Sequence, residues 1–190
     1  VRLPHSYQPN DSRRKIAERQ FTRAQTGLPP SGFVFCCFNG HRKIVPETFD
    51  SWMRILSAVD GSVLWLLQDS DGSVAALRAQ AQARGVDGTR LIFAGFMKLD
   101  EHLARLRLAD LCLDTAPYNA HTTASDALWA GVPVLTCMGK SFTSRVGASL
   151  LTAVGLPELI TNTREEYEAL AIALVQDPAR LAAIRQKLAD

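Results

Sequence analysis

The residues best suited to chemistry stand together where an apolar, alanine-rich helix over 124–130 is expected to begin. His121, Thr122 and Thr123 lead into that helix, and Asp126 follows within its first turn. The first turn of a helix offers unpaired backbone N–H groups and the positive end of the helix dipole, which together bind phosphate. The two hydroxyls and the imidazole can donate to the same oxygens. A carboxylate at Asp126 would repel phosphate, but it suits the hydroxyls of a ribose.

The same residues have an explanation that needs no ligand. The run from Thr123 to Asp126 fits a capping box, in which a Thr and an acidic residue three positions later satisfy the N–H groups at a helix start. Such boxes are common, so the pattern alone favours capping and phosphate binding about equally.

Lys43 is a second candidate because of its place between two predicted elements. It follows an apolar run over 32–38, suited to a buried strand, and precedes a helix expected over 46–59. In a doubly wound sheet, the loop between them lies at the carboxyl edge of the strands, where ligands bind. A lysine there can stabilise negative charge on a departing diphosphate without a metal. A solvated surface lysine is the ordinary alternative.

The elements that must position these residues alternate regularly along the chain. Apolar runs at 32–38, 62–67, 90–94, 108–113 and 132–136 predict strands, and the segments between them predict helices. Short connections favour a parallel sheet with right-handed crossovers. We therefore expect an α/β fold, with a Rossmann-like parallel sheet and helices on both faces, over residues 31–190. Residues 1–30 are polar, basic and interrupted by prolines, and are expected to be a linker and lead-in.

The composition is that of ordinary globular protein and limits the classes of function. A net charge of +2 argues against a dedicated nucleic-acid surface, and no apolar run approaches the roughly 18 residues that span a membrane.

The cysteines lie in strand-like runs without a CxxC pair, so buried free thiols in a reducing cytoplasm are expected rather than zinc ligands. The three tryptophans fall on apolar faces and are expected in the core. These residues are Cys36, Cys37, Cys112 and Cys137, and Trp52, Trp65 and Trp129. Because the chain begins with Val rather than Met, we expect a piece of a longer polypeptide.

The segment from Leu113 to Val134 resembles a known signature. It reads Leu-Asp-Thr-x-Pro-Tyr-Asn-Ala-His-Thr-Thr-x-x-Asp-x-Leu-Trp-Ala-Gly-x-Pro-Val, which is similar to the signature of the O-linked N-acetylglucosamine transferases, glycosyltransferase family 41, and especially to their bacterial relatives. The likeness covers most of the chain from about residue 3. It implies the C-terminal catalytic lobe of a two-lobed GT-B glycosyltransferase.

The resemblance implies a role for each candidate residue. Lys43 matches the essential lysine that contacts phosphate, and it is the one catalytic residue expected within the chain. Diphosphate contacts are implied for His121, Thr122 and Thr123, and ribose contacts for Asp126. The remaining implied contacts concern the base: His102 lies against the uracil ring, Arg105 lies near it, and the backbone of Met97 reads its edge.

Two positions depart from the family pattern. Gly40 stands where most members carry Gln or Asn, so it can offer only its backbone N–H to the donor. Leu99 stands where the family has a lysine beside the nucleoside. Donor affinity or sugar preference is expected to differ as a result.

The implied function is that of the donor-binding lobe of an inverting, metal-independent transferase, which moves N-acetylglucosamine from UDP-GlcNAc to Ser or Thr hydroxyls of proteins. No cofactor and no metal site are expected. The general base and the protein acceptor are expected to involve an N-terminal lobe and tetratricopeptide repeats outside this chain, and nucleic acid and membrane are not expected as partners. Two alternatives stay open: a related transferase using another donor, such as UDP-glucose or GDP-fucose, and a non-catalytic module that binds a nucleotide or a partner.

Overall fold

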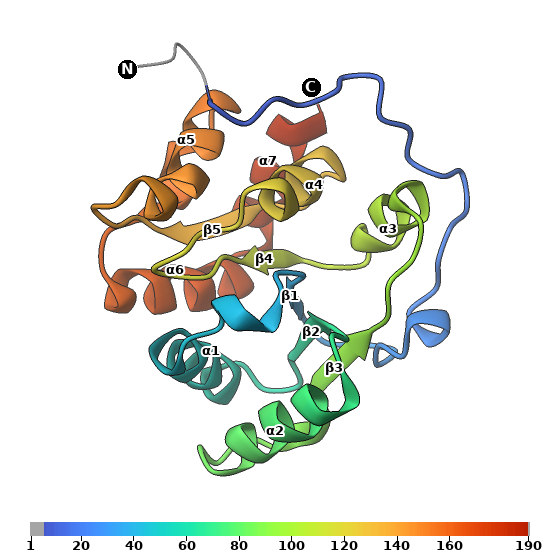
Figure 1. Cartoon of the computed structure of the whole chain (residues 1–190), viewed down its shortest axis with the longest axis vertical. Coiled ribbons are helices and arrows are strands. Elements are labelled where there is room, and N and C mark those ends of the chain that lie inside the picture. Colours follow the sequence, from blue (N-terminus) through green and yellow to red (C-terminus); the bar gives the residue numbers. More distant parts are fainter. Residues whose placement is uncertain (1–5, 190) are drawn as a thin grey trace.

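A six-stranded parallel sheet forms the centre of the molecule (Figure 1). The computed structural model describes residues 6–189, so the ends of the two predicted ranges, residues 1–5 and residue 190, lie outside the described residues. The strands lie in the order β3-β2-β1-β4-β5-β6. Their bounds are β1 Val34–Cys37, β2 Val63–Leu67, β3 Leu91–Ala94, β4 Leu111–Leu113, β5 Val134–Cys137 and β6 Ile160–Thr161. The predicted Rossmann-like α/β fold is confirmed.

Helices cover both faces of the sheet, as the sequence predicted. Figure 1 shows α3, α4 and α5 on one side of the sheet and α1, α2 and α6 on the other. The helices are α1 Pro46–Ala58, α2 Asp71–Gln82, α3 Leu99–Leu106, α4 Thr122–Trp129, α5 Val146–Ala153, α6 Arg164–Gln176 and α7 Pro178–Ala189. The strands are short, and the two central ones, β1 and β4, are apolar and fully buried between these layers, as is typical of parallel sheets. None of the helices in the described residues is long and apolar enough to cross a membrane.

The direction of strand addition reverses between β1 and β4. From β1 the chain builds outward through β2 to β3, then returns to place β4 on the other side of β1. At such a switch point, the loops that follow the two central strands diverge and leave a crevice at the carboxyl edge of the sheet. The loop after β1 carries the short 3₁₀ turn η2, His41–Lys43, and the loop after β4 leads to α4. The fold therefore brings Lys43 and the start of α4 to one edge.

The core accounts for most, but not all, of the expected buried residues. Trp52 and Trp65 are fully buried, as predicted. The prediction for Trp129 is wrong: its side chain is substantially exposed and its indole N–H donates to the carbonyl of Arg14 at 3.2 Å. Trp129 lies on the one face of α4 that is turned away from the apolar core. The four cysteines are free thiols, three of them buried and Cys137 partly buried.

The N-terminal segment lies against the outer side of α4 and α3 before it enters the sheet (Figure 1, dark blue). The backbone N–H of Ala17 donates to the carbonyl of Asp100 at 3.0 Å, which ties the segment to the start of α3. It then forms the short 3₁₀ turn η1, Ala24–Thr26, which ends at Gly27 with a φ of 74°, a value that favours glycine. The described part of residues 1–30 thus packs on the lobe, and its use as an inter-lobe linker stays a prediction.

Candidate functional site

Lys43 ends the η2 turn and reaches across the crevice to the loop after β4. Its ammonium donates to the carbonyl of Asn119 at 3.0 Å and lies 4.3 Å from the centre of the Tyr118 ring. Burial lowers the pKa of Lys43, while the nearby Asp114 carboxyl opposes this shift. A partly desolvated ammonium interacts more strongly with an incoming anion than one in bulk water does.

A buried carboxyl at the end of β4 fixes the loop that faces Lys43. Asp114 is 2% exposed and accepts hydrogen bonds from the backbone N–H groups of Thr115 at 2.8 Å and Ala120 at 2.6 Å, and from the hydroxyl of Thr136 at 2.6 Å. Burial raises the pKa of Asp114 to about 7, against the opposing effects of these hydrogen bonds and of Lys43. Sequence reasoning missed this residue, although a carboxylate that directly follows an apolar strand was a usable signal.

A second set of side-chain hydrogen bonds joins the ends of β1 and β4 to α4. The amide N–H of Asn39 donates to the Thr115 hydroxyl at 2.9 Å, and the Thr123 hydroxyl donates to the Asn39 carbonyl oxygen at 2.6 Å. The Thr123 hydroxyl proton is therefore already used within the protein. Asn39 is 3% exposed and was also missed, because only the fold places it beside Thr123.

The start of α4 is not a capping box. His121 is the N-cap and makes no side-chain capping bond, while the Thr123 and Asp126 side chains bond to other segments. The first intrahelical bond runs from the Ser125 N–H to the His121 carbonyl at 3.1 Å. The N–H groups of 122–124 therefore have no partner within the helix, as at any helix start. The capping-box explanation of this motif is therefore wrong for Thr123 and Asp126, whose side chains have their partners in Asn39 and Arg14.

His121 is held by two tyrosines. Its ring stacks on Tyr118, with ring centres 5.2 Å apart, and its Nδ1 is hydrogen-bonded to the Tyr7 hydroxyl. Its Nε2 is buried and has no hydrogen-bond partner among the described residues. Burial lowers the pKa of His121 and Lys43 lowers it further, while the Thr143 backbone opposes these shifts, so burial favours the neutral imidazole. A tyrosine hydroxyl that donates to Nδ1 leaves the proton on Nε2, where it can serve an anion.

Thr122 and Asp126 lie one turn apart on α4 and differ in exposure. Thr122 is exposed, and its hydroxyl accepts from the Gln8 side chain at 3.4 Å. Asp126 is buried and forms an ion pair with Arg14. Burial raises the pKa of Asp126, while the bonded Arg14 opposes this shift.

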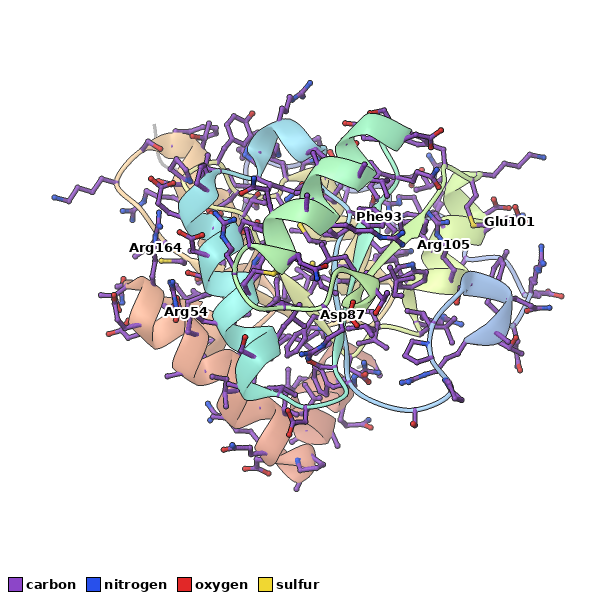
Figure 2. The ribbon with its side chains drawn as sticks, turned by 90° about the horizontal axis from the view of Figure 1, so that it is seen from below. Arg54, Asp87, Phe93, Glu101, Arg105 and Arg164 are labelled. Atoms are coloured by element: carbon purple, nitrogen blue, oxygen red, sulfur yellow. The ribbon has the colours of Figure 1, made fainter. Side chains whose placement is uncertain are left out.

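Helix α3 holds His102 and, one turn later near its end, Arg105, beside the end of β1. The Arg105 Nε donates to His102 Nδ1 at 3.0 Å, and its Nη1 donates to the Gly95 carbonyl at 2.8 Å. The His102 ring packs edge-on against Phe38, with ring centres 4.8 Å apart. Figure 2 shows Arg105 on the opposite side of the view from Arg54, which lies on α1. Arg105 is 4% exposed, so it positions His102 and the loop after β3 rather than projecting into solvent.

The two loops around the crevice place the remaining candidates. Gly40 is the N-cap of η2 and has a φ of −57°, and a Cβ built at this position would meet nothing within 4 Å. Glycine is therefore not required there by the backbone or by packing. Met97 lies partly buried in the loop between β3 and α3, and Leu99 is 50% exposed at the start of α3. The structure thus brings Lys43, His121, Thr122 and Thr123 together at the switch point, while His102 and Arg105 flank it and Asp126 lies under Arg14.

The strand order is that of a doubly wound, Rossmann-like domain, which binds nucleotides at its switch point, and this is the fold of the C-terminal lobe of GT-B glycosyltransferases. The chain belongs to glycosyl transferase family 41, whose family profile matches residues 12–190. It is similar to the UDP-N-acetylglucosamine–peptide N-acetylglucosaminyltransferase of Caenorhabditis elegans, with 43% identity over 88% of the chain. Among solved structures, it is similar to a lysine-to-methionine mutant of the Thermobaculum terrenum O-GlcNAc transferase, with a TM-score of 0.85 and 35% identity over 99% of the chain.

A more distant likeness concerns the fold alone. The sucrose-phosphate synthase of Thermosynechococcus elongatus matches 87% of the chain with a TM-score of 0.62 and 20% identity. The chain spans 14% of the length of the C. elegans relative and 35% of the T. terrenum chain. Within residues 6–189, no group of three or more His, Cys, Asp or Glu side chains could hold a metal ion.

Proposed function

We propose that this chain is the donor-binding lobe of an inverting, metal-independent transferase that moves N-acetylglucosamine from UDP-GlcNAc to Ser or Thr hydroxyls of proteins. The observation that carries the proposal is the pairing of Lys43 with the start of α4 across the switch point. Both flank one ring, since the Lys43 ammonium lies over Tyr118 and His121 stacks on it. Membership of family 41 and the relatives named above support the choice of reaction.

The chemistry at this point is charge stabilisation. Breaking the anomeric C–O bond leaves negative charge on the β-phosphate oxygen of the departing diphosphate. In this proposal, that charge is stabilised by Lys43, by the N–H groups of the first turn of α4, which have no partner within the helix, and by the unpartnered Nε2 of His121. Fixed donors of this kind stabilise a developing anion without a metal. The acceptor hydroxyl and the general base are proposed to involve an N-terminal lobe and tetratricopeptide repeats outside this chain.

The nucleoside is proposed to lie between α3 and α4. His102, held by Arg105, would pack against the uracil ring, the Met97 backbone would read its edge, and Asp126 would accept from the ribose. Gly40 would offer its N–H to the donor, and the open space at this position leaves room for a water or for a larger sugar substituent. The four free cysteines support a reducing, cytoplasmic location.

Calorimetric titration without added metal tests the proposal. The full chain is titrated with UDP and GDP, and Lys43→Met and Thr122→Ala are compared with Lys187→Met as the control, because Lys187, on α7, pairs with Glu158 and not with the loops of the proposed site. We expect selective binding of UDP that Lys43→Met weakens about 10- to 100-fold, the effect of losing a hydrogen bond to a charged group. Preference for GDP would indicate a fucose-type donor. Binding that is equal in Lys43→Met and Lys187→Met would overturn the assignment of the site.

A further inference from the structure

The face of α4 that is turned away from the core carries a stripe of polar groups. Thr122, Ser125, Asp126 and Trp129 are spaced i, i+3, i+4 and i+7, so they share one side of the helix. The other residues of α4 include the buried Ala124, Ala127 and Leu128, which pack into the core. The proposed donor site uses the first turn of this stripe, but a nucleotide does not account for its whole length.

Residues 7–14, here called the strap, cover the stripe. The strap contacts α4 in chain order along the helix, through pairs that join Tyr7 to His121, Gln8 to Thr122, Asn10 to Ser125, and Arg14 to both Asp126 and Trp129. Because each side-chain contact joins one strap residue to a polar group of α4, the two segments match along the helix. Specific hydrogen bonds therefore hold the strap along α4, at the edge of the proposed donor site.

The pair between Arg14 and Asp126 is the most buried of the strap's ion pairs. The side chains are 15% and 8% exposed, whereas the neighbouring Arg13 is 90% exposed and pairs with Asp11. Arg14 Nη2 bonds one oxygen of the Asp126 carboxylate, and Arg14 Nε is buried without an acceptor among the described residues. A carboxylate can accept more than one hydrogen bond. The Arg14 Nε–H, which has no acceptor among the described residues, therefore lies in the same pair as a carboxylate that can accept a further hydrogen bond.

A ribose hydroxyl matches this combination, because it accepts one hydrogen bond and donates another. We propose that Arg14 is a further binding residue of the donor site: it fixes the Asp126 carboxylate, and its Nε–H and that carboxylate together bind a ribose hydroxyl. The inference rests on the proposed function. Burial works against ionisation of Asp126, and the guanidinium counters that effect, which agrees with a role in keeping the carboxylate ready to accept.

Titration with deoxyribose analogues distinguishes a ribose contact of Arg14 from a purely structural role. UDP is compared with its 2′-deoxy and 3′-deoxy forms in the full chain and in Arg14→Gln, Arg14→Lys, Asp126→Asn and the double variant Arg14→Gln/Asp126→Asn. Arg13→Gln is the matched control. The readout is the ratio of the affinity for UDP to the affinity for the deoxy form that binds more weakly, and thermal unfolding of each variant checks that it folds.

We expect the wild type and Arg13→Gln to prefer UDP by about tenfold or more, the effect of one hydrogen bond to a charged group. Arg14→Gln should lower this ratio to about one, and the double variant should match Asp126→Asn, because the two residues act through one contact. Arg14→Lys should fall in between, since lysine keeps the charge but loses the planar fork.

The other outcomes are equally decisive. A wild-type ratio retained in a folded Arg14→Gln or Arg14→Lys variant would show that Arg14 supports the structure only. Tighter UDP binding by Arg14→Gln would show that the strap blocks the site instead of completing it. Wild-type binding of UDP without preference over either deoxy form would overturn the ribose contact alone, whereas no UDP binding at all would overturn the proposed function and this inference with it.

Discussion

His102 offers a test of the site through stability, without any ligand. Burial and, to a lesser extent, the charge of Arg105, whose Nε donates to its Nδ1, together lower the pKa of His102 from 6.5 to about 4. Since the pKa is lower in the folded state than in the unfolded state, neutral His102 contributes its full stability above about pH 6.5. That contribution is lost as the pH falls towards 4. A shift of this size corresponds to about 3 kcal/mol.

The perturbation is His102→Gln, which retains a side-chain oxygen to accept from Arg105 and does not titrate. At pH 7.5 we expect the variant to be about 1 kcal/mol less stable, because the edge-on contact with Phe38 is lost. Between pH 7.5 and pH 4.5 the wild type should lose about 2–3 kcal/mol more than the variant, so the order of stability reverses.

The assay is urea unfolding of both proteins at pH 7.5, 6.0 and 4.5, with the free energy of unfolding extrapolated to water. Taking the difference between the two proteins at each pH removes the contributions of every other titrating group, including Asp114. Parallel stability profiles would refute the reasoning, because they would mean that His102 is accessible to protons in the folded state. The edge-on packing and the Arg105 hydrogen bond would then not describe its environment in solution.

Three further substitutions test other parts of the site. Between pH 5 and pH 8, the unfolding free energy of Asp114→Asn, measured in urea, should rise by about 2 kcal/mol relative to that of the wild type. The folded-state pKa of Asp114, about 7, lies above its usual value, so the wild type loses stability as the pH rises over this range. Gly147→Ala should lower the unfolding free energy by about 1–3 kcal/mol, since its Cβ would lie 2.6 Å from both Asp114 Oδ2 and Thr136 Oγ1. The control Gly72→Ala, whose new Cβ would enter open space in α2, should not lower the unfolding free energy in the same assay. Gly40→Asn should leave thermal unfolding unchanged and tighten UDP binding up to about tenfold in calorimetry, because a new amide donor can enter open space beside the proposed phosphates.

Local sequence patterns were sufficient to predict the fold. Apolar runs alternating with helical spacing predicted the parallel sheet, which the structure confirms. The sequence also predicted that Lys43 lies at the carboxyl edge of the strands, and the structure has Lys43 in the loop after β1, with the start of α4 following β4 beside it. What each candidate side chain binds in a substrate complex stays a prediction.

Contacts between distant segments could not be predicted in the same way. The run from Thr123 to Asp126 satisfies the sequence rule for a capping box, yet Thr123 donates to Asn39, which lies 84 positions earlier, and Asp126 pairs with Arg14, 112 positions earlier. A local pattern gives the polar groups that a helix start offers, but tertiary packing decides which partners reach them. The exposure of Trp129 has the same origin, since its indole serves the strap rather than the core.

The polar stripe of α4 nevertheless left a trace in the sequence. A helix that is apolar all round would be wholly buried in such a domain, but α4 places Thr122, Ser125 and Asp126 on one side of a helix whose other residues are mostly alanine and leucine. Polar groups on an otherwise buried helix require partners, because an unpaired buried carboxylate is strongly destabilising. A capping box explains a partner at the first turn only, and a donor nucleotide reaches little further. The remainder of the stripe needs a second polar segment along the helix, and only the structure identifies it as the strap, whose Arg14 pairs with Asp126.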